Sequence, residues 1–229
     1  MANIILINDQ DQEQILSGVE QITARSPGGT ENFVQGSAVI AAQKVTGSIL
    51  DRSISGEYSN AEVAELGHSA FRLCKSLSGI SLPNVIKVGQ DAFAGCVALK
   101  SVTLPEATTI DTAAFVGCSA LADILLPKAT NIGQSAFWSC GALQRVNLPN
   151  VLSLADRAFL NCSTLSTVVL SGPQLCSLGG TEAFSGTPVV KSQTSGYIYV
   201  PDYSVELYKS TKNWSAYADK IKPISELNV

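Results

Sequence analysis

Apolar side chains recur along most of this chain at a fixed interval of 22 residues. Five of the six cysteines mark the interval, and in each copy a phenylalanine lies three residues before the cysteine and a leucine three residues after it. These cysteines are Cys74, Cys96, Cys118, Cys140 and Cys162. A spacing this regular is typical of repeat proteins, in which each repeat forms one structural unit.

Each unit combines two different hydrophobic periods. The segment 102–104 alternates apolar and polar residues, which predicts a half-buried strand. From Phe93 through Cys96 to Leu99 the apolar residues are three apart, which favours a short helical or 3₁₀ turn on the opposite side of the coil. Proline closes four of the five copies, and because proline lacks an amide hydrogen, we expect each strand to end there.

A single coil of this length cannot bury its apolar face. Ordering costs about 1–2 kcal/mol per residue, whereas one buried Phe or Leu returns only about 1.5–3 kcal/mol. The coils must therefore stack. The sequence predicts an α/β solenoid of about six 22-residue coils, with a short parallel sheet along one face. The sixth copy, from Leu178 to Phe184, is degenerate and lacks the cysteine.

The two ends of the chain lack the repeat. We expect residues 1–55 to form an N-terminal cap or a small attachment region, 56–200 the solenoid, and 201–229 a helical C-terminal cap, because a solenoid must cover its terminal coils. In the first region Ile15, Val19 and Ile22 are at helical spacing, and the weakly charged segment 32–49 favours strands.

The unit I-G-x-x-A-F-x-x-C-x-x-L-x-x-V-x-L-P resembles the BspA-type leucine-rich repeat of bacterial surface proteins. The helical-turn part of this motif is intact at Val88–Leu99 and Ile132–Leu143. The resemblance extends over about residues 60–221, and the ending from Tyr197 onward is similar to the usual terminus of such proteins. It implies a non-catalytic binding or adhesion module for a protein or glycan partner, on the bacterial surface or a phage particle. The alternative is an intracellular scaffold for protein–protein interaction.

Composition narrows the choice of partners. Charged residues make up 15% of the chain and the net charge is −4, so we expect no nucleic-acid partner. The longest apolar run is far shorter than a membrane span, so we expect no membrane insertion. We also see no standard secretory signal at the N-terminus.

The cysteines and the single histidine offer little chemistry. Cysteines that share one inward position are expected to act as small buried hydrophobes, with disulfides and a metal site as the alternatives. Cys-x₂-Cys pairs are absent and His68 has no second histidine, so we expect no metal, no cofactor and no enzyme. Cys176 lies outside the column. It is the candidate for a reactive thiol, although a buried small residue is the simpler interpretation.

Candidate binding residues are those at which the repeats differ, because the shared positions form the core. Each phenylalanine is followed by a variable residue, and in three consecutive coils this residue is large and apolar. These residues are Val116, Trp138 and Leu160. Tryptophan is enriched at interface hot spots, so this stripe is predicted to contact a partner or a second copy of the chain.

A second candidate set lies on the outward side of the predicted strands. It is mixed in character, with one acidic, one basic, one amide and one apolar residue. The set consists of Asp123, Leu125, Arg145 and Asn147.

Overall fold

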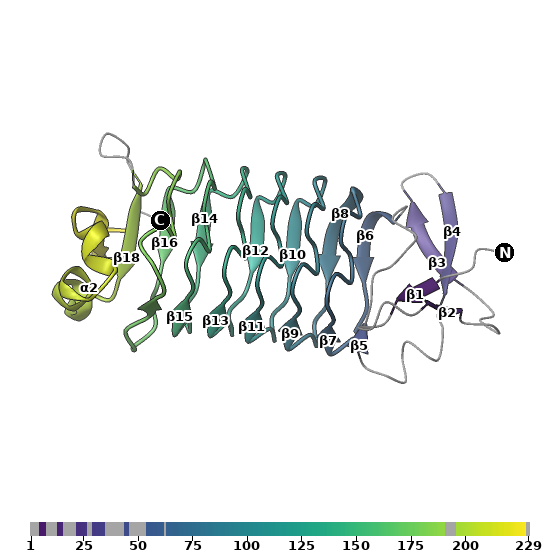
Figure 1. The fold of residues 1–229 in the computed structure, drawn as a ribbon, viewed down its shortest axis with the longest axis horizontal. Coiled ribbons are helices and arrows are strands. Elements are labelled where there is room, and N and C mark those ends of the chain that lie inside the picture. The colour runs from purple at the N-terminus through teal and green to yellow at the C-terminus, as the bar shows by residue number, and fades with distance from the viewer. Residues whose placement is uncertain are drawn as a thin grey trace.

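In the computed structural model, residues 54–61, 63–190 and 196–227 are described together with their side chains. Before them, only the backbone of five short strands is described. The described repeats form an elongated parallel-stranded solenoid of about seven turns (Figure 1). The predicted fold class is confirmed.

The longer strands lie side by side along one face of the solenoid. They form two parallel four-stranded sheets instead of one continuous sheet. The first contains β6 (Ser55–Ser59), β8 (Ser76–Ser81), β10 (Ser101–Thr103) and β12 (Asp123–Leu125). The second contains β14 (Arg145–Asn147), β16 (Thr167–Val169), β18 (Tyr197–Val200) and β19 (Ile221–Pro223).

A third sheet runs along another face and was not predicted. It is a parallel ladder of seven two-residue strands. They are β5 (Lys44–Val45), β7 (Glu65–Leu66), β9 (Lys87–Val88), β11 (Thr109–Ile110), β13 (Asn131–Ile132), β15 (Ser153–Leu154) and β17 (Ser177–Leu178). Because β5 pairs with β7, this ladder begins inside the segment assigned above to the N-terminal region.

The prediction of a helical or 3₁₀ turn between phenylalanine and cysteine is wrong. The chain forms separate hydrogen-bonded turns there, for example from the Cys96 amide to the Phe93 carbonyl at 3.1 Å. Asp91 and Gly95 have φ values of 55° and 73°, and such left-handed residues interrupt any helix. The apolar residues are nevertheless three apart, because a turn of this kind joins residues i and i+3 by a hydrogen bond.

Columns of identical side chains fill the interior, as predicted. From Phe71 to Phe159 the successive rings stack with centroids 5.0–5.2 Å apart. Beside them, each cysteine from the second coil onward donates its S–H to the phenylalanine carbonyl of the preceding coil, as Cys118 does to Phe93 at 3.1 Å. All six cysteines are buried and free, so the disulfide alternative is wrong.

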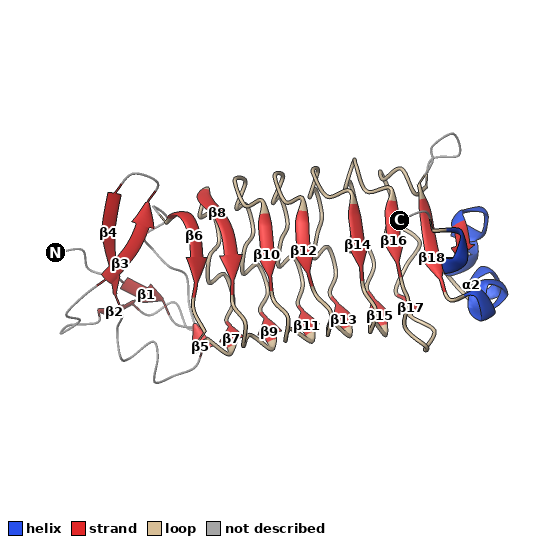
Figure 2. Cartoon of the chain, turned by 180° about the vertical axis from the view of Figure 1, so that it is seen from behind, coloured by secondary structure: helices blue, strands red, loops and turns tan. Residues whose placement is uncertain are grey.

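The C-terminal cap also matches its prediction. Helices are confined, among the described residues, to this end of the molecule (Figure 2). They are η1 (Asp202–Ser204), α2 (Val205–Ser210), η2 (Trp214–Lys220) and η3 (Ile224–Glu226). Trp214 ends the aromatic column, with its ring 6.2 Å from that of Phe184, and its indole N–H donates to the Cys176 carbonyl at 2.7 Å. None of these helices has the length and hydropathy of a membrane span.

The helix predicted near the N-terminus is wrong in the residues that can be compared. Ile15 belongs to β2 (Glu13–Ile15), which pairs with β1 (Ile5–Ile7), and Ile22 begins β3 (Ile22–Ser26). β3 forms an antiparallel pair with β4 (Gly29–Val34), and this pairing supplies backbone hydrogen bonds that outweigh the helical spacing. Val19 lies outside the described residues, as does most of segment 32–49 beyond β4 and β5.

Candidate binding site on the long-strand face

The long-strand face is interrupted between β12 and β14. Every other pair of successive long strands shares a parallel ladder, but these two belong to different sheets. In neighbouring coils the Leu104 amide donates to the Leu125 carbonyl at 3.2 Å, and the Leu148 amide donates to the Val169 carbonyl at 2.9 Å. Across the break, within the described solenoid, the equivalent bonds from Leu126 and Gln144 are not formed.

Side-chain burial changes at the same place. Ile124, the central residue of β12, is only half-buried, whereas the valines at the same position in β10, β14 and β16 are buried. Leu125 is 52% exposed, which makes it one of the few large apolar side chains on the surface. The break therefore places unpaired backbone groups directly beside an exposed leucine.

A depression of about 580 Å³ lies over the break. The four residues predicted on the outward side of the strands all line it: Asp123, Leu125, Arg145 and Asn147. Gln144 and Ser101 also line it, although they were not among the predicted binding residues. The outward position of Ser101 was recognisable from the strand alternation, whereas Gln144 has the parity of the buried Val146 and is exposed only because it precedes β14. Nothing in the repeat indicated that the sheet opens beside them.

The site has a negative charge on one strand and a positive charge on the next. Asp123 begins β12 and Arg145 begins β14, and both side chains are exposed. Leu125 and Asn147 hold the corresponding last positions. An apolar centre with a polar, charged rim is the usual composition of a protein-binding surface. We call the surface made by Asp123, Leu125, Gln144, Arg145 and Asn147 the sheet-face site.

The other predicted set lies on the turn segments and does not join the sheet-face site. Val116 and Leu160 are half-buried and Trp138 is 41% exposed. Their backbones are stacked coil on coil, since Gly117 donates to the Trp138 carbonyl at 2.8 Å and Ser139 to the Leu160 carbonyl at 2.9 Å. The three residues therefore occupy equivalent positions in successive coils, and the role of this stripe in binding stays a prediction.

The residues considered for chemistry lie in unremarkable surroundings. Cys176 is fully buried, and burial raises the pKa of its thiol to about 12, which favours the interpretation as a buried small residue over a reactive thiol. His68 is exposed on the surface, with Nε2 3.7 Å from an Asp91 carboxylate oxygen. Among the described residues, no group of three or more histidine, cysteine or acidic side chains is placed to hold a metal ion.

Comparison with known proteins shows the family to which the chain belongs. Residues 55–195 match the BspA type leucine rich repeat region, with six copies, and the chain belongs to this family. A fold of this class suggests a protein-binding module. No curated protein matches the sequence.

Three solved structures are similar to this chain, and the first of them supports the fold. A leucine-rich repeat protein from Bacteroides ovatus is 24% identical, with a TM-score of 0.58 over 75% of this chain. This chain spans 45% of that protein's length. A leucine rich cell surface protein from Faecalibacterium prausnitzii is 22% identical, with a TM-score of 0.43 over 97% of this chain and 53% of its own. A leucine rich repeat protein from T. pallidum is 23% identical, with a TM-score of 0.44 over 66% of this chain and 82% of its own.

Proposed function

We propose that this chain is a non-catalytic binding module that holds a partner protein on its sheet-face site, on the surface of a bacterial cell. The observation that carries the proposal is the opening of the long-strand sheet between β12 and β14 beneath the exposed Leu125. Elsewhere along this face the strands are joined by ladders, so the break is the position with spare hydrogen-bonding capacity.

The site offers three kinds of contact in a small area. A partner can bury Leu125, which contributes about 1.5–3 kcal/mol for a leucine that becomes fully covered. It can pair charges with Asp123 and Arg145, which favours fast and selective association. It can also bond to the backbone amides of Leu126 and Gln144, which have no ladder partner across the break, as an extended peptide does at a sheet edge.

The surface location rests on membership of the family, whose proteins are typically surface-associated. Treatment of intact producing cells with a protease tests it. We expect the chain to be digested while a cytoplasmic enzyme in the same cells survives. Survival of the chain until the cells are lysed would support the intracellular scaffold instead, and recovery of the chain in phage particles would place it there.

The site is tested by comparing two variants with equally exposed leucines. The double variant Leu125→Asp, Arg145→Glu removes the apolar centre and reverses one charge, whereas Leu207→Asp changes a leucine on α2 that is also 52% exposed. Partners would be crosslinked to the wild-type chain, identified by mass spectrometry, purified, and measured by biolayer interferometry. We expect the double variant to weaken binding by at least about 30-fold, the effect of losing one hot spot, and Leu207→Asp to leave it unchanged. Equal affinities for wild type and double variant contradict the proposal.

A further inference from the structure

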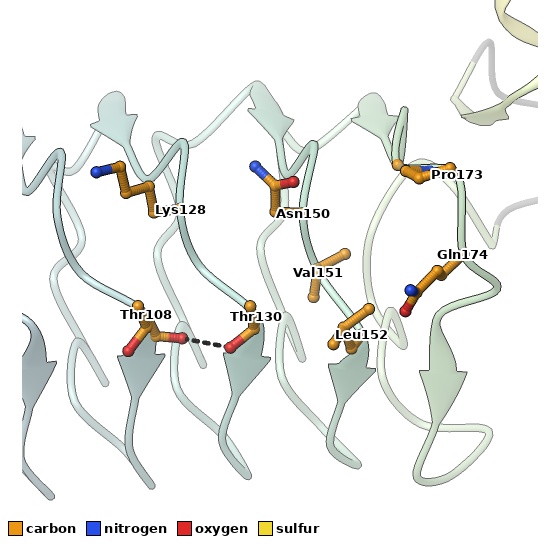
Figure 3. Close-up of a pocket in the computed structure, with 9 residues that line it drawn as sticks. Thr108, Lys128, Thr130, Asn150, Val151, Leu152, Pro173 and Gln174 are labelled. Carbon is orange, nitrogen blue, oxygen red and sulfur yellow. Dashed lines mark hydrogen bonds between the residues drawn. The ribbon is translucent and has the colours of Figure 1, made fainter.

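A groove on another flank of the solenoid has a different chemistry from the sheet-face site. It lies between the turn after the long strands and the beginning of the short strands, and encloses about 400 Å³ (Figure 3). One wall carries Lys128 and Asn150, and the other carries Thr108, Thr130 and Leu152. We infer that this flank groove binds a neutral oligosaccharide.

The polar side chains of the groove are fixed by the coil beneath them. Thr130 donates its hydroxyl to the Thr108 carbonyl at 3.1 Å, and Thr108 donates to the Ile86 carbonyl at 3.3 Å. The Thr130 hydroxyl also accepts a bond from the Asn131 side-chain amide at 3.0 Å. Each hydroxyl therefore has its donor occupied and keeps at least one lone pair to accept a bond from a ligand. Asn150 donates to the Pro127 carbonyl at 2.7 Å, which leaves its own side-chain carbonyl as an acceptor. Groups held in this way lose little entropy when a ligand binds.

The charge balance of the groove favours a neutral ligand. Lys128 is the only charged residue among those that line it in the described structure. Its ammonium is 2.6 Å from a carboxylate oxygen of Glu106 in the preceding coil, so its charge is already paired. A phosphate or carboxylate ligand would have to compete with that carboxylate, whereas sugar hydroxyls need only the acceptors just described.

The groove also has apolar surface, against which the C–H face of a sugar ring can pack. Leu152 is 42% exposed within the groove, and Pro173 lies at one end of it. At that same end the Tyr203 hydroxyl donates to the Pro173 carbonyl at 3.5 Å, and the tyrosine is 75% exposed. Tyr203 does not line the groove itself, but it adds an amphipathic aromatic side chain at the end marked by Pro173, and such a side chain suits a pyranose ring.

The repeat sets the length of ligand that the groove accepts. Coils stack 5.0–5.2 Å apart at the aromatic column, close to the length of one residue in an extended β-linked glycan. The wall residues come from successive coils, so neighbouring sugars would meet Thr108, Thr130 and Leu152 in turn. We therefore expect β-linked tetrasaccharides to bind more tightly than the corresponding disaccharides.

Calorimetric titration of the whole chain tests this site with four neutral probes: cellotetraose, mannotetraose, xylotetraose and tetra-N-acetylchitotetraose. We expect at least one to bind, and Thr130→Val to weaken that binding by about threefold to tenfold, the effect of one lost hydrogen bond. Valine is compatible with the position because Ile86 and Leu152 occupy it in other coils. The matched control is Thr167→Val on the long-strand face, which should bind as the wild type does.

Three results overturn the assignment. They are no binding of any probe up to about 10 mM, well beyond weak millimolar affinity, equal binding by Thr130→Val, and tighter binding of tetragalacturonate than of every neutral probe. Thermal unfolding of each variant verifies that it is folded. The outcome is separable from the proposed function, because Leu125→Asp should retain sugar binding and Thr130→Val should retain the protein partner.

Discussion

At the scale of single residues, glycines at two different positions of the repeat carry different constraints. A Cβ at Gly89 would lie 2.6 Å from the Leu66 carbonyl oxygen of the preceding coil. A Cβ at Gly117 would meet nothing nearer than 3.9 Å, but this residue has a φ of +71°. We expect Gly117→Ala to cost about 1 kcal/mol for the left-handed backbone, and Gly89→Ala to cost more, up to about 3 kcal/mol, for overpacking.

Urea unfolding of the two glycine variants measures the difference. Asp111 occupies the position of Gly89 in the next coil, so the stack can open slightly at this level. If Gly89→Ala proves the milder change, the backbone relaxes there as it does around Asp111, and close packing is not the reason for the glycine.

The buried thiols predict how stability depends on pH. Burial raises the pKa of Cys118 and of Cys162 to about 12, from an ordinary value of 9.0. The unfolded chain therefore loses these protons at lower pH than the folded chain does. Their stabilising effect is complete below about pH 9 and is lost progressively between about pH 9 and pH 12.

Thermal midpoints between about pH 8 and pH 11 measure this loss, and Cys118→Ala serves as the comparison because it removes one titrating group. We expect the midpoint to fall less steeply with pH in the variant than in the wild type, even though the variant is less stable at neutral pH. Parallel pH profiles would mean that the thiols do not cause the alkaline loss.

Residue-scale predictions from the sequence succeeded where the repeat itself fixes the environment. The phenylalanine, cysteine and leucine that recur from coil to coil can all be buried only if the coils stack, and all of them are buried. The outward residues Asp123, Leu125 and Arg145 were recognisable from strand alternation, and all three are exposed. Thr130 and Asn150 were missed as binding candidates because their coil segment shows no strand alternation and its side-chain directions depend on the fold.

At the scale of elements, the C-terminal cap shows how a solenoid end is closed. Trp214 is fully buried against Phe184, Tyr208 and Tyr217. We expect Trp214→Ala to lower the free energy of unfolding by about 3–5 kcal/mol, because a large ring is lost from a packed position. Tyr217→Phe should cost about 1–3 kcal/mol, since its hydroxyl donates to the Thr181 carbonyl at 2.6 Å and accepts from the buried Phe184 amide at 3.5 Å, and both bonds are removed.

The same unfolding experiment includes Tyr203→Phe as a control. That tyrosine is 75% exposed, so the free energy of unfolding of the variant should equal that of the wild type. A Trp214→Ala variant as stable as the control would show that the last coil needs no cover, against the nearest-neighbour picture of solenoids.

Elements were predicted unevenly, for reasons that lie in their length. The long strands have three or more residues, enough for alternation to be visible, as in β10. The second ladder has strands of only two residues, such as Ile110 with Thr109, and two residues carry no period. The turns have the same residue spacing as a 3₁₀ helix and differ from it only in their backbone angles. Asp91 and Ala113 have positive φ values, and their residue types do not indicate this.

At the scale of the whole molecule, the break between β12 and β14 could not have been predicted. Residues 122–126 and 144–148 both keep the strand pattern of the repeat, so the sequence implies an unbroken sheet. The opposite ladder continues through β11, β13 and β15, and the aromatic column is continuous there as well, with Phe115 and Phe137 5.2 Å apart. The solenoid is therefore joined at its interior and along one face while it is open on the other.

This partial opening predicts a local difference in hydrogen exchange. The amides of Leu126 and Gln144 have no ladder partner across the break in the described solenoid, whereas those of Leu148 and Ser166 donate to carbonyls of the neighbouring coil, Val169 at 2.9 Å and Gln144 at 3.0 Å. We expect the first pair to exchange at least about tenfold faster than the second under native conditions, because these amides have no ladder hydrogen bond that must open first. Residue-resolved exchange by NMR measures both pairs in one sample. Equal protection would mean that β12 and β14 pair in solution, and the sheet-face site would then lose its free backbone groups and depend on Leu125 and the two charges alone.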